Sequence, residues 1–162
     1  MVWVRRSLQK VRAGLMAGVC LGTVAAHATD AMWSPAPENN NWNDGVNWVS
    51  TPPHTVPDGT ATFGVSSKTL IVFSQGFTAI NNMSFGSSAP SYTFTLVGTQ
   101  GLDINGNPGG SPLGGIDVAS SFRPNFNVES LVGLTFHNFA VASSTNIFNN
   151  GGATTFRDRS AS

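Results

Sequence analysis

Cysteine is nearly absent from this sequence. The 162 residues include a single cysteine, Cys20, which lies close to the amino terminus. One cysteine cannot form an internal disulfide, so a disulfide-stabilised framework is excluded. Residues 29–162 contain no cysteine at all, which also excludes a thiolate zinc site and a cysteine nucleophile from that part of the chain.

Long apolar segments are equally scarce, and the longest follows a cluster of positive charge. Four of the eight basic residues fall within the first twelve positions: Arg5, Arg6, Lys10 and Arg12. The apolar run that follows, residues 13–26, is shorter than the roughly 20 residues that a membrane-spanning helix needs. It ends in Ala-His-Ala at residues 26–28, a small-x-small pattern typical of signal cleavage. We therefore predict a cleavable signal helix over residues 1–28, cut between Ala28 and Thr29.

Such a signal predicts export across the inner membrane, and two routes fit it. The segment Arg-Arg-Ser-Leu-Gln-Lys at residues 5–10 resembles the twin-arginine motif, while a basic cluster also suits the general secretory route. Lipid attachment to Cys20 is disfavoured, because the preceding Ala-Gly-Val lacks the expected leucine. The expected location is the cell surface, the outer membrane or the extracellular space.

Positive charge is rare after the signal. Residues 29–162 hold four basic and eight acidic side chains, which gives a net charge of −4. An acidic domain does not offer the basic surface that nucleic acids require, so nucleic acid is excluded as a partner. No second long apolar run follows, and we expect no integral membrane segment in the mature chain. Its 134 residues are enough for the core of one domain.

Helical spacing of apolar residues is also missing from the mature chain. Apolar residues instead alternate in short groups separated by Gly and Asn, for example Met83/Phe85, Phe94/Leu96 and Leu134/Phe136. Period-two alternation predicts an all-β fold of short strands. Short strands suit the stacked coils of a solenoid, and a β-sandwich is the alternative. In a solenoid Phe85, Phe94 and Phe136 lie in or beside columns of parallel strands, whereas a sandwich pairs their strands antiparallel.

The three tryptophans outside the signal are close together in the sequence. Trp33, Trp42 and Trp48 all belong to residues 29–64, a segment that also contains a Pro-Pro pair. Buried indoles could cover the end of a strand stack, whereas exposed indoles could stack on sugar rings as in a carbohydrate-binding module. We favour the first interpretation and predict a Trp-rich cap over residues 29–64, followed by β-strand repeats over residues 65–162.

Several of these motifs resemble one family. They are Trp33, Asn41-Trp42-Asn43, Asn47-Trp48, Val-Pro-Asp-Gly at 56–59, Ala-Thr-Phe-Gly at 61–64 and Ile-Asn-Asn-Met-Ser-Phe at 80–85. The series resembles the amino-terminal passenger region of bacterial autotransporters of the β-strand-repeat type, and residues 147–156 resemble one Asn-Asn-Gly-Gly repeat unit. The resemblance implies a right-handed parallel β-helix carried to the cell surface.

Two departures from that family stand out. A complete autotransporter ends in a membrane β-barrel translocator, which is absent from this chain, and the passenger-like region is short. We therefore expect that the repeat region over residues 65–162 is incomplete at its carboxyl end.

No residue set predicts catalysis. Strand alternation places His137 outward, where we expect it to be solvated, and His54 lies in a proline-rich loop. Glycan cleavage needs two carboxylates about 5–9.5 Å apart, and the acidic residues here are scattered singly. Asp103 and Asp117 could share one sheet face, which keeps a β-helical polysaccharide-cleaving enzyme as an alternative. We expect no enzymatic activity.

Two stretches carry oxygen ligands of the kind that calcium prefers. Asp103, Asn105 and Asn107 occupy alternate positions around a glycine, and Asp117 follows a pair of glycines. Neither stretch supplies further carboxylates, and the same residues suit tight turns. These four residues are weak calcium candidates, and we predict no metal site and no cofactor.

The sequence as a whole favours an exported, passenger-like domain with a structural or adhesive role. Surface glycans and host or neighbouring cells are its candidate partners. A carbohydrate-binding module that uses Trp33, Trp42 and Trp48 is the alternative of a different class.

Overall fold

The computed structural model describes residues 28–74, 76–99, 101–107 and 114–158. The predicted signal helix therefore lies outside the described residues, apart from Ala28. Within them the fold is all-β: short strands are joined by loops, and a single turn of 3-10 helix, Gly45–Asn47, is the one helical element. The prediction of an all-β fold is confirmed.

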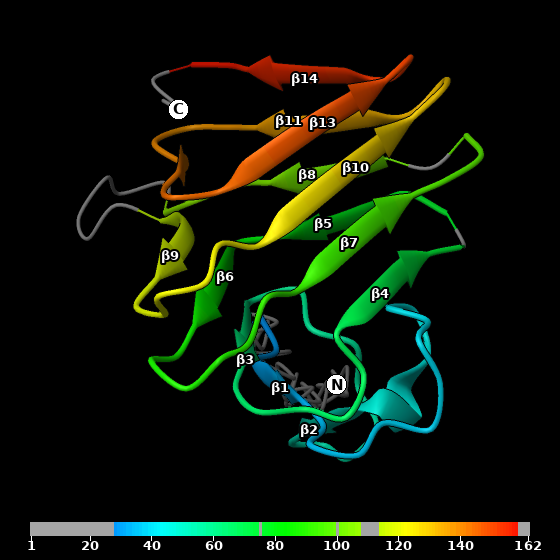
Figure 1. Cartoon of the computed structure of the whole chain (residues 1–162), viewed down its shortest axis with the longest axis vertical. Coiled ribbons are helices and arrows are strands. Elements are labelled where there is room, and N and C mark those ends of the chain that lie inside the picture. Colours follow the sequence, from blue (N-terminus) through cyan, green and yellow to red (C-terminus); the bar gives the residue numbers. More distant parts are fainter. Residues whose placement is uncertain (1–27, 75, 100, 108–113, 159–162) are drawn as a thin grey trace, which may run out of the picture.

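The strands form three sheets, which we call A, B and C (Figure 1). Sheet A has the order β12 (Val141–Ala142), β9 (Gly115–Val118), β6 (Asn82–Phe85), β3 (Thr60–Phe63), β1 (Ala31–Trp33) and β2 (Trp48–Ser50). Sheet B has the order β13 (Asn146–Asn150), β10 (Asn125–Glu129), β7 (Thr93–Leu96) and β4 (Leu70–Phe73). Sheet C has the order β14 (Ala153–Phe156), β11 (Gly133–Phe136), β8 (Gly101–Ile104) and β5 (Thr78–Ile80).

From β3 onward the chain visits the three sheets in a fixed rotation. It passes from A to B to C and then returns to A beside the strand it left, so each strand pairs with the strand three elements later (Figure 1). These pairs are all parallel, and among the named strands only β1 and β2 pair antiparallel. The antiparallel pairing that a β-sandwich requires is therefore absent from the strands that carry Phe85, Phe94 and Phe136.

Because neighbouring strands are parallel and in register, similar side chains on successive strands lie above one another in columns. Phe94 on β7 lies opposite Phe126 on β10. Their ring centroids are 4.8 Å apart, and the two rings are nearly parallel, with an interplanar angle of 17°. Phe63 and Phe85 stack at 4.7 Å in sheet A. These distances equal the spacing of neighbouring strands, about 4.8 Å, which is why aromatic residues at matching positions stack face to face. Phe136 likewise stacks on Phe156 at 4.9 Å, so Phe85, Phe94 and Phe136 all lie in columns of parallel strands and not in antiparallel pairs.

The alternation read from the sequence sets the core. Along β6, β7, β8 and β11 every second side chain is buried, and the intervening ones are partly exposed. Tyr92, just before β7, joins this core: its ring is fully buried, and its hydroxyl donates a hydrogen bond of 2.8 Å to the carbonyl of Gly64. Burial raises the pKa of Tyr92 from 10.0 to about 12, although a hydrogen bond with Ser66 acts in the opposite direction.

All three tryptophans of the amino-terminal segment are buried. Trp33, Trp42 and Trp48 are exposed by 2% or less, and Trp48 packs edge-on against both of the others at 5.1 and 4.8 Å. Trp42 stacks on Phe73 of β4 at 4.7 Å. Covered indoles have no face to offer to a sugar ring, so the alternative in which these three residues form a carbohydrate platform is wrong.

The asparagines between the tryptophans hold this segment against sheet B. The backbone of Trp42 donates to the carbonyl of Val72 on β4, and Val72 donates to the carbonyl of Asn40. The fully buried Asn47 side chain donates to Asn39 Oδ1 and to the Asn41 carbonyl, both at 2.8 Å. The backbone hydrogen bonds to Val72 thus cover the outer edge of β4 at this residue, and the Asn47 amide satisfies the Asn41 carbonyl in the segment that covers it.

The opposite end of the stack is different. Strands β12, β13 and β14 are the last in their sheets, and among the described residues no further strand pairs with them. Phe156 stacks on Phe136 at 4.9 Å but is 38% exposed, and Ile147, which lies opposite the buried Phe126, is only partly buried. The inward columns thus end at a partly uncovered layer.

Candidate functional site

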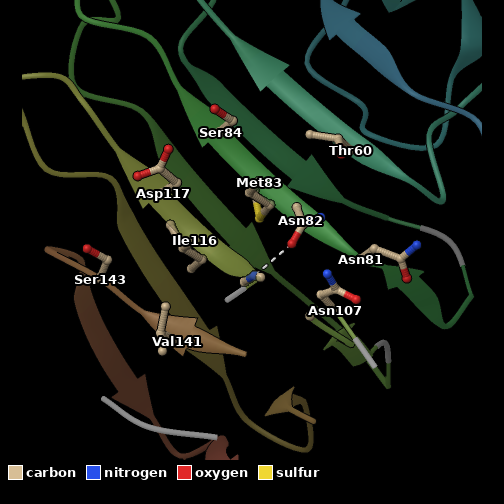
Figure 2. Close-up of a pocket in the computed structure, with 13 residues that line it drawn as sticks. Thr60, Asn81, Asn82, Met83, Ser84, Asn107, Ile116, Asp117, Val141 and Ser143 are labelled. Carbon is tan, nitrogen blue, oxygen red and sulfur yellow. Dashed lines mark hydrogen bonds between the residues drawn. The ribbon is translucent and has the colours of Figure 1, made fainter. Parts of the chain in front are cut away.

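The outer face of sheet A carries a groove of about 450 Å³ (Figure 2). It crosses the strands, because its walls come from β3, β6, β9 and β12 and from the loops beside them. Its described lining residues are Thr60, Asn81, Asn82, Met83, Ser84, Gly106, Asn107, Gly114, Gly115, Ile116, Asp117, Val141 and Ser143. A volume of this size lies within the range of about 300–1,000 Å³ that small-ligand sites occupy.

Two rows of outward side chains border the groove. In the first row Thr60, Asn82, Gly115 and Val141 occupy matching register positions on four neighbouring strands. In the second row Ser84 lies opposite Asp117, on the next pair of outward positions (Figure 2). Because neighbouring strands are about 4.8 Å apart, the positions of each row recur at that interval. In the first row the side chains are polar at Thr60 and Asn82 but not at Gly115 and Val141.

A glycine pair lines the groove at the first of these rows. Gly115 has a φ of +115°, and a Cβ there would collide with the backbone of Val141 on β12. A Cβ on Gly114 would collide with Asn82 Oδ1 and lie 2.5 Å from the Asn107 nitrogen. Only glycine fits both positions, since it lacks a Cβ and adopts positive φ without strain. Without side chains, these two residues can lie close to the Val141 backbone, to Asn82 and to the Asn107 nitrogen.

The same glycine pair fixes one wall of the groove. The Gly115 nitrogen donates a hydrogen bond of 2.8 Å to Asn82 Oδ1, drawn as the dashed line in Figure 2. With its oxygen held in this way, the Asn82 side chain is oriented before any ligand binds. The Asp117 carboxylate is the one ionisable group among the described lining residues, and it is exposed. The groove is therefore polar and weakly acidic.

The structure separates the two carboxylates considered for glycan cleavage. Asp103 lies on β8 in sheet C, whereas Asp117 lies on β9 in sheet A. The expectation that they could share one sheet face is wrong, because the loop between them carries the chain from one sheet to the next. Alternation along a strand predicts only that a residue faces outward, and not on which of three sheets it does so.

The four weak calcium candidates are likewise divided. Asn107 and Asp117 line the groove on sheet A, while Asp103 contacts His137 on sheet C. The carbonyl of Asn105 accepts a hydrogen bond of 2.9 Å from Asn138 Nδ2, a contact between neighbouring layers of the stack. Within the described ranges, no cluster of three or more His, Cys, Asp or Glu side chains is arranged to hold a metal ion.

One polar cluster was missed by the sequence reasoning. His137 Nε2 lies 3.1 Å from Asp103 Oδ2, and its Nδ1 lies 3.8 Å from Asp158 Oδ2. The side chain of His137 is 24% exposed, so the expectation of a fully solvated histidine is wrong. His54 is exposed, with a φ of +59°. The contacts of His137 join three successive layers of the stack, which is a structural role for a side chain in this position.

No protein-family model, curated protein or solved structure matches this chain. The autotransporter resemblance therefore remains a hypothesis that rests on the sequence motifs. Across the described residues, no helix is long and apolar enough to pass through a membrane.

Proposed function

We propose that the protein is an exported, passenger-like domain whose work is structural display and adhesion, and that its strands form a right-handed parallel β-helix. The observation that carries this proposal is the fixed rotation of the chain through sheets A, B and C with parallel pairing in register. Parallel strands joined by a crossover within one sheet are right-handed in about 98% of cases, which supports the handedness.

A stack of this kind suits display because the inward side chains form the core, while the outward side chains can vary without affecting it. The inward columns are apolar and close-packed, so they maintain the fold. The outward positions carry side chains that the core does not use, such as Ser84 and Asp117 on sheet A, Thr95 and Asn127 on sheet B, and Asp103 and Thr135 on sheet C. Each layer can therefore present a different set of polar groups without disturbing the packing.

Export is supported by the basic and apolar pattern of residues 1–28, and the surface location by the passenger resemblance. The candidate partners are surface glycans and host or neighbouring cells. Catalysis is not part of the proposal: Asp103 and Asp117 lie on separate sheets, which leaves the polysaccharide-cleaving alternative without its carboxylate pair.

Fractionation of a bacterium that expresses the chain tests export. We expect the exported form to begin at Thr29 when its first residues are sequenced. A double variant, Arg5→Lys with Arg6→Lys, keeps the positive charge but removes the arginine pair, so it blocks export only if the twin-arginine route is used. A full-length protein that stays in the cytoplasm would contradict the proposal.

Adhesion is tested with beads coated with the exported protein. We expect cells to be retained on beads that carry the folded protein and lost from beads that carry the same protein unfolded by heat. Equal retention on both would mean that the folded surface does not mediate attachment, and the adhesive part of the proposal would fail.

A further inference from the structure

We infer that the groove on sheet A is a binding site for a neutral saccharide. This inference rests on the proposed display role, for which it names a class of ligand. The groove and its lining do not depend on whether the protein reaches a surface. Four observations carry the inference: the direction of the groove, the chemistry of its lining, its charge, and the pairing of its strands.

The direction of the groove suits a chain-like ligand. It runs across β3, β6, β9 and β12, along the axis of the stack. Outward positions therefore recur at the strand spacing of about 4.8 Å, which is comparable with the length of one sugar unit in an oligosaccharide, and polar side chains occupy them on β3, β6 and β9. A ligand of two or three sugar units placed along the groove meets a new layer of side chains at each unit.

The lining chemistry matches hydroxyl groups. Asn82 carries a side-chain amide, Ser84 a hydroxyl and Asp117 a carboxylate. Amides and hydroxyls both donate and accept hydrogen bonds, and a carboxylate accepts from two hydroxyls at once. Sugar hydroxyls, which also donate and accept, can pair with all three. Gly114 and Gly115 also line the groove, where they contribute backbone atoms only.

The charge of the groove excludes anionic ligands. None of the described lining residues is basic, and the exposed Asp117 adds one negative charge. A phosphate, a sulfate or an acidic sugar would lie beside that carboxylate without a cation to pair with it, which is unfavourable. The ligand is therefore a neutral sugar chain.

The pairing of the strands disfavours an extended peptide. A peptide gains affinity at a sheet by adding a strand to an unpaired edge. Strands β6 and β9 are paired on both sides, β6 with β3 and β9, and β9 with β6 and β12. Their backbone groups are already used, so the groove offers side chains and not a strand edge.

Titration of the purified protein with neutral oligosaccharides tests the inference. The probes are cellotriose, maltotriose and the trimer of N-acetylglucosamine, and binding is followed by calorimetry and by NMR shifts of the Gly114 and Gly115 amides. Trigalacturonate serves as the acidic probe and an extended decapeptide as the peptide probe. We expect at least one neutral trimer to bind and to shift those two amides, and both other probes to leave them unchanged.

Matched variants localise the binding. Ser84→Leu and Asp117→Leu place apolar bulk on neighbouring strands of sheet A, while Thr95→Leu and Asn127→Leu do the same at paired outward positions of sheet B. We expect each sheet A variant to weaken binding by about tenfold or more, because it removes a hydrogen-bonding group and fills part of the groove. The sheet B variants should bind as the parent does.

Three results would overturn the inference: no neutral trimer binds to the folded protein, binding is equally affected by the variants of both sheets, or the acidic or peptide probe occupies the groove instead. Circular dichroism of every variant separates lost binding from lost folding. A failure of this kind with the fold intact leaves the proposed export and display untouched, since those depend on the signal and on the strand stack.

Discussion

Tyr92 makes the stability of the protein sensitive to alkaline pH. It is the only tyrosine in the sequence, and its pKa is raised to about 12 in the folded protein because its ring is buried among the aromatic columns. An unfolded chain has a tyrosine pKa of about 10. Between these values the folded protein keeps the phenolic proton, whereas the unfolded chain has released it. The free energy of unfolding must therefore fall as the pH rises from 10 to 12.

The size of this fall follows from the two pKa values. Each unit of difference corresponds to about 1.4 kcal/mol, so the loss reaches up to about 2.7 kcal/mol above pH 12 and is negligible below pH 9. A total stability of about 5–15 kcal/mol is typical of a domain, which makes a loss of this size easy to detect. Urea unfolding, followed by the fluorescence of the buried tryptophans, measures it at a series of pH values.

The matched control is Tyr92→Phe. This variant loses the hydrogen bond to the Gly64 carbonyl, and we expect it to be about 1 kcal/mol less stable than the parent at neutral pH. It cannot ionise at residue 92. The difference in free energy of unfolding between the parent and the variant should therefore narrow and then reverse as the pH rises from 10 to 12. Lysine titration, common to both proteins, cancels in the comparison. Parallel stability curves for the two proteins across this range would refute the reasoning.

Two further predictions concern contacts between layers of the stack. Gly115→Ala should be about 1–3 kcal/mol more destabilising than Gly98→Ala in urea unfolding, because both residues have positive φ but only the Cβ at 115 collides with backbone; equal losses would show that the clash is relieved elsewhere. A double-mutant cycle on His137→Ala and Asp103→Asn should give a coupling of about 0.2–1 kcal/mol, as expected for a partly exposed pair. A coupling of zero would mean that the 3.1 Å contact contributes nothing to stability.

Period-two alternation made the core predictable from the sequence. Met83 and Phe85, or Leu134 and Phe136, are inward wherever their strands are placed, because alternate side chains of any strand share a face. The burial of the tryptophans followed from similar reasoning: three large indoles close together in a short segment have more apolar area than one surface is expected to expose.

Contacts between layers were not predictable in the same way. His137 and Asp103 are 34 residues apart, and whether they meet depends on the lengths of the loops that close each layer. Those loops are irregular, so a spacing in the sequence does not translate into a register. For the same reason Asp103 and Asp117 could not be assigned to separate sheets, and the groove beside Gly115 could not be foreseen. Its signal was the Gly-Gly pair at 114–115, which the sequence alone explains equally well as a turn.

The two ends of the strand stack differ in how their strand edges are covered. At one end the tryptophan segment covers the edge of β3 with β1 and the edge of β4 with backbone hydrogen bonds to Val72. At the other end, no described strand pairs with the outer edges of β12, β13 and β14, and the partly exposed Phe156 ends the column that contains Phe136. A further layer added at that end would need only to match its nearest neighbour, since each layer contacts only the one before it. Within the described residues, a further layer would therefore lengthen the stack at the β12, β13 and β14 end without changing the contacts of the earlier layers.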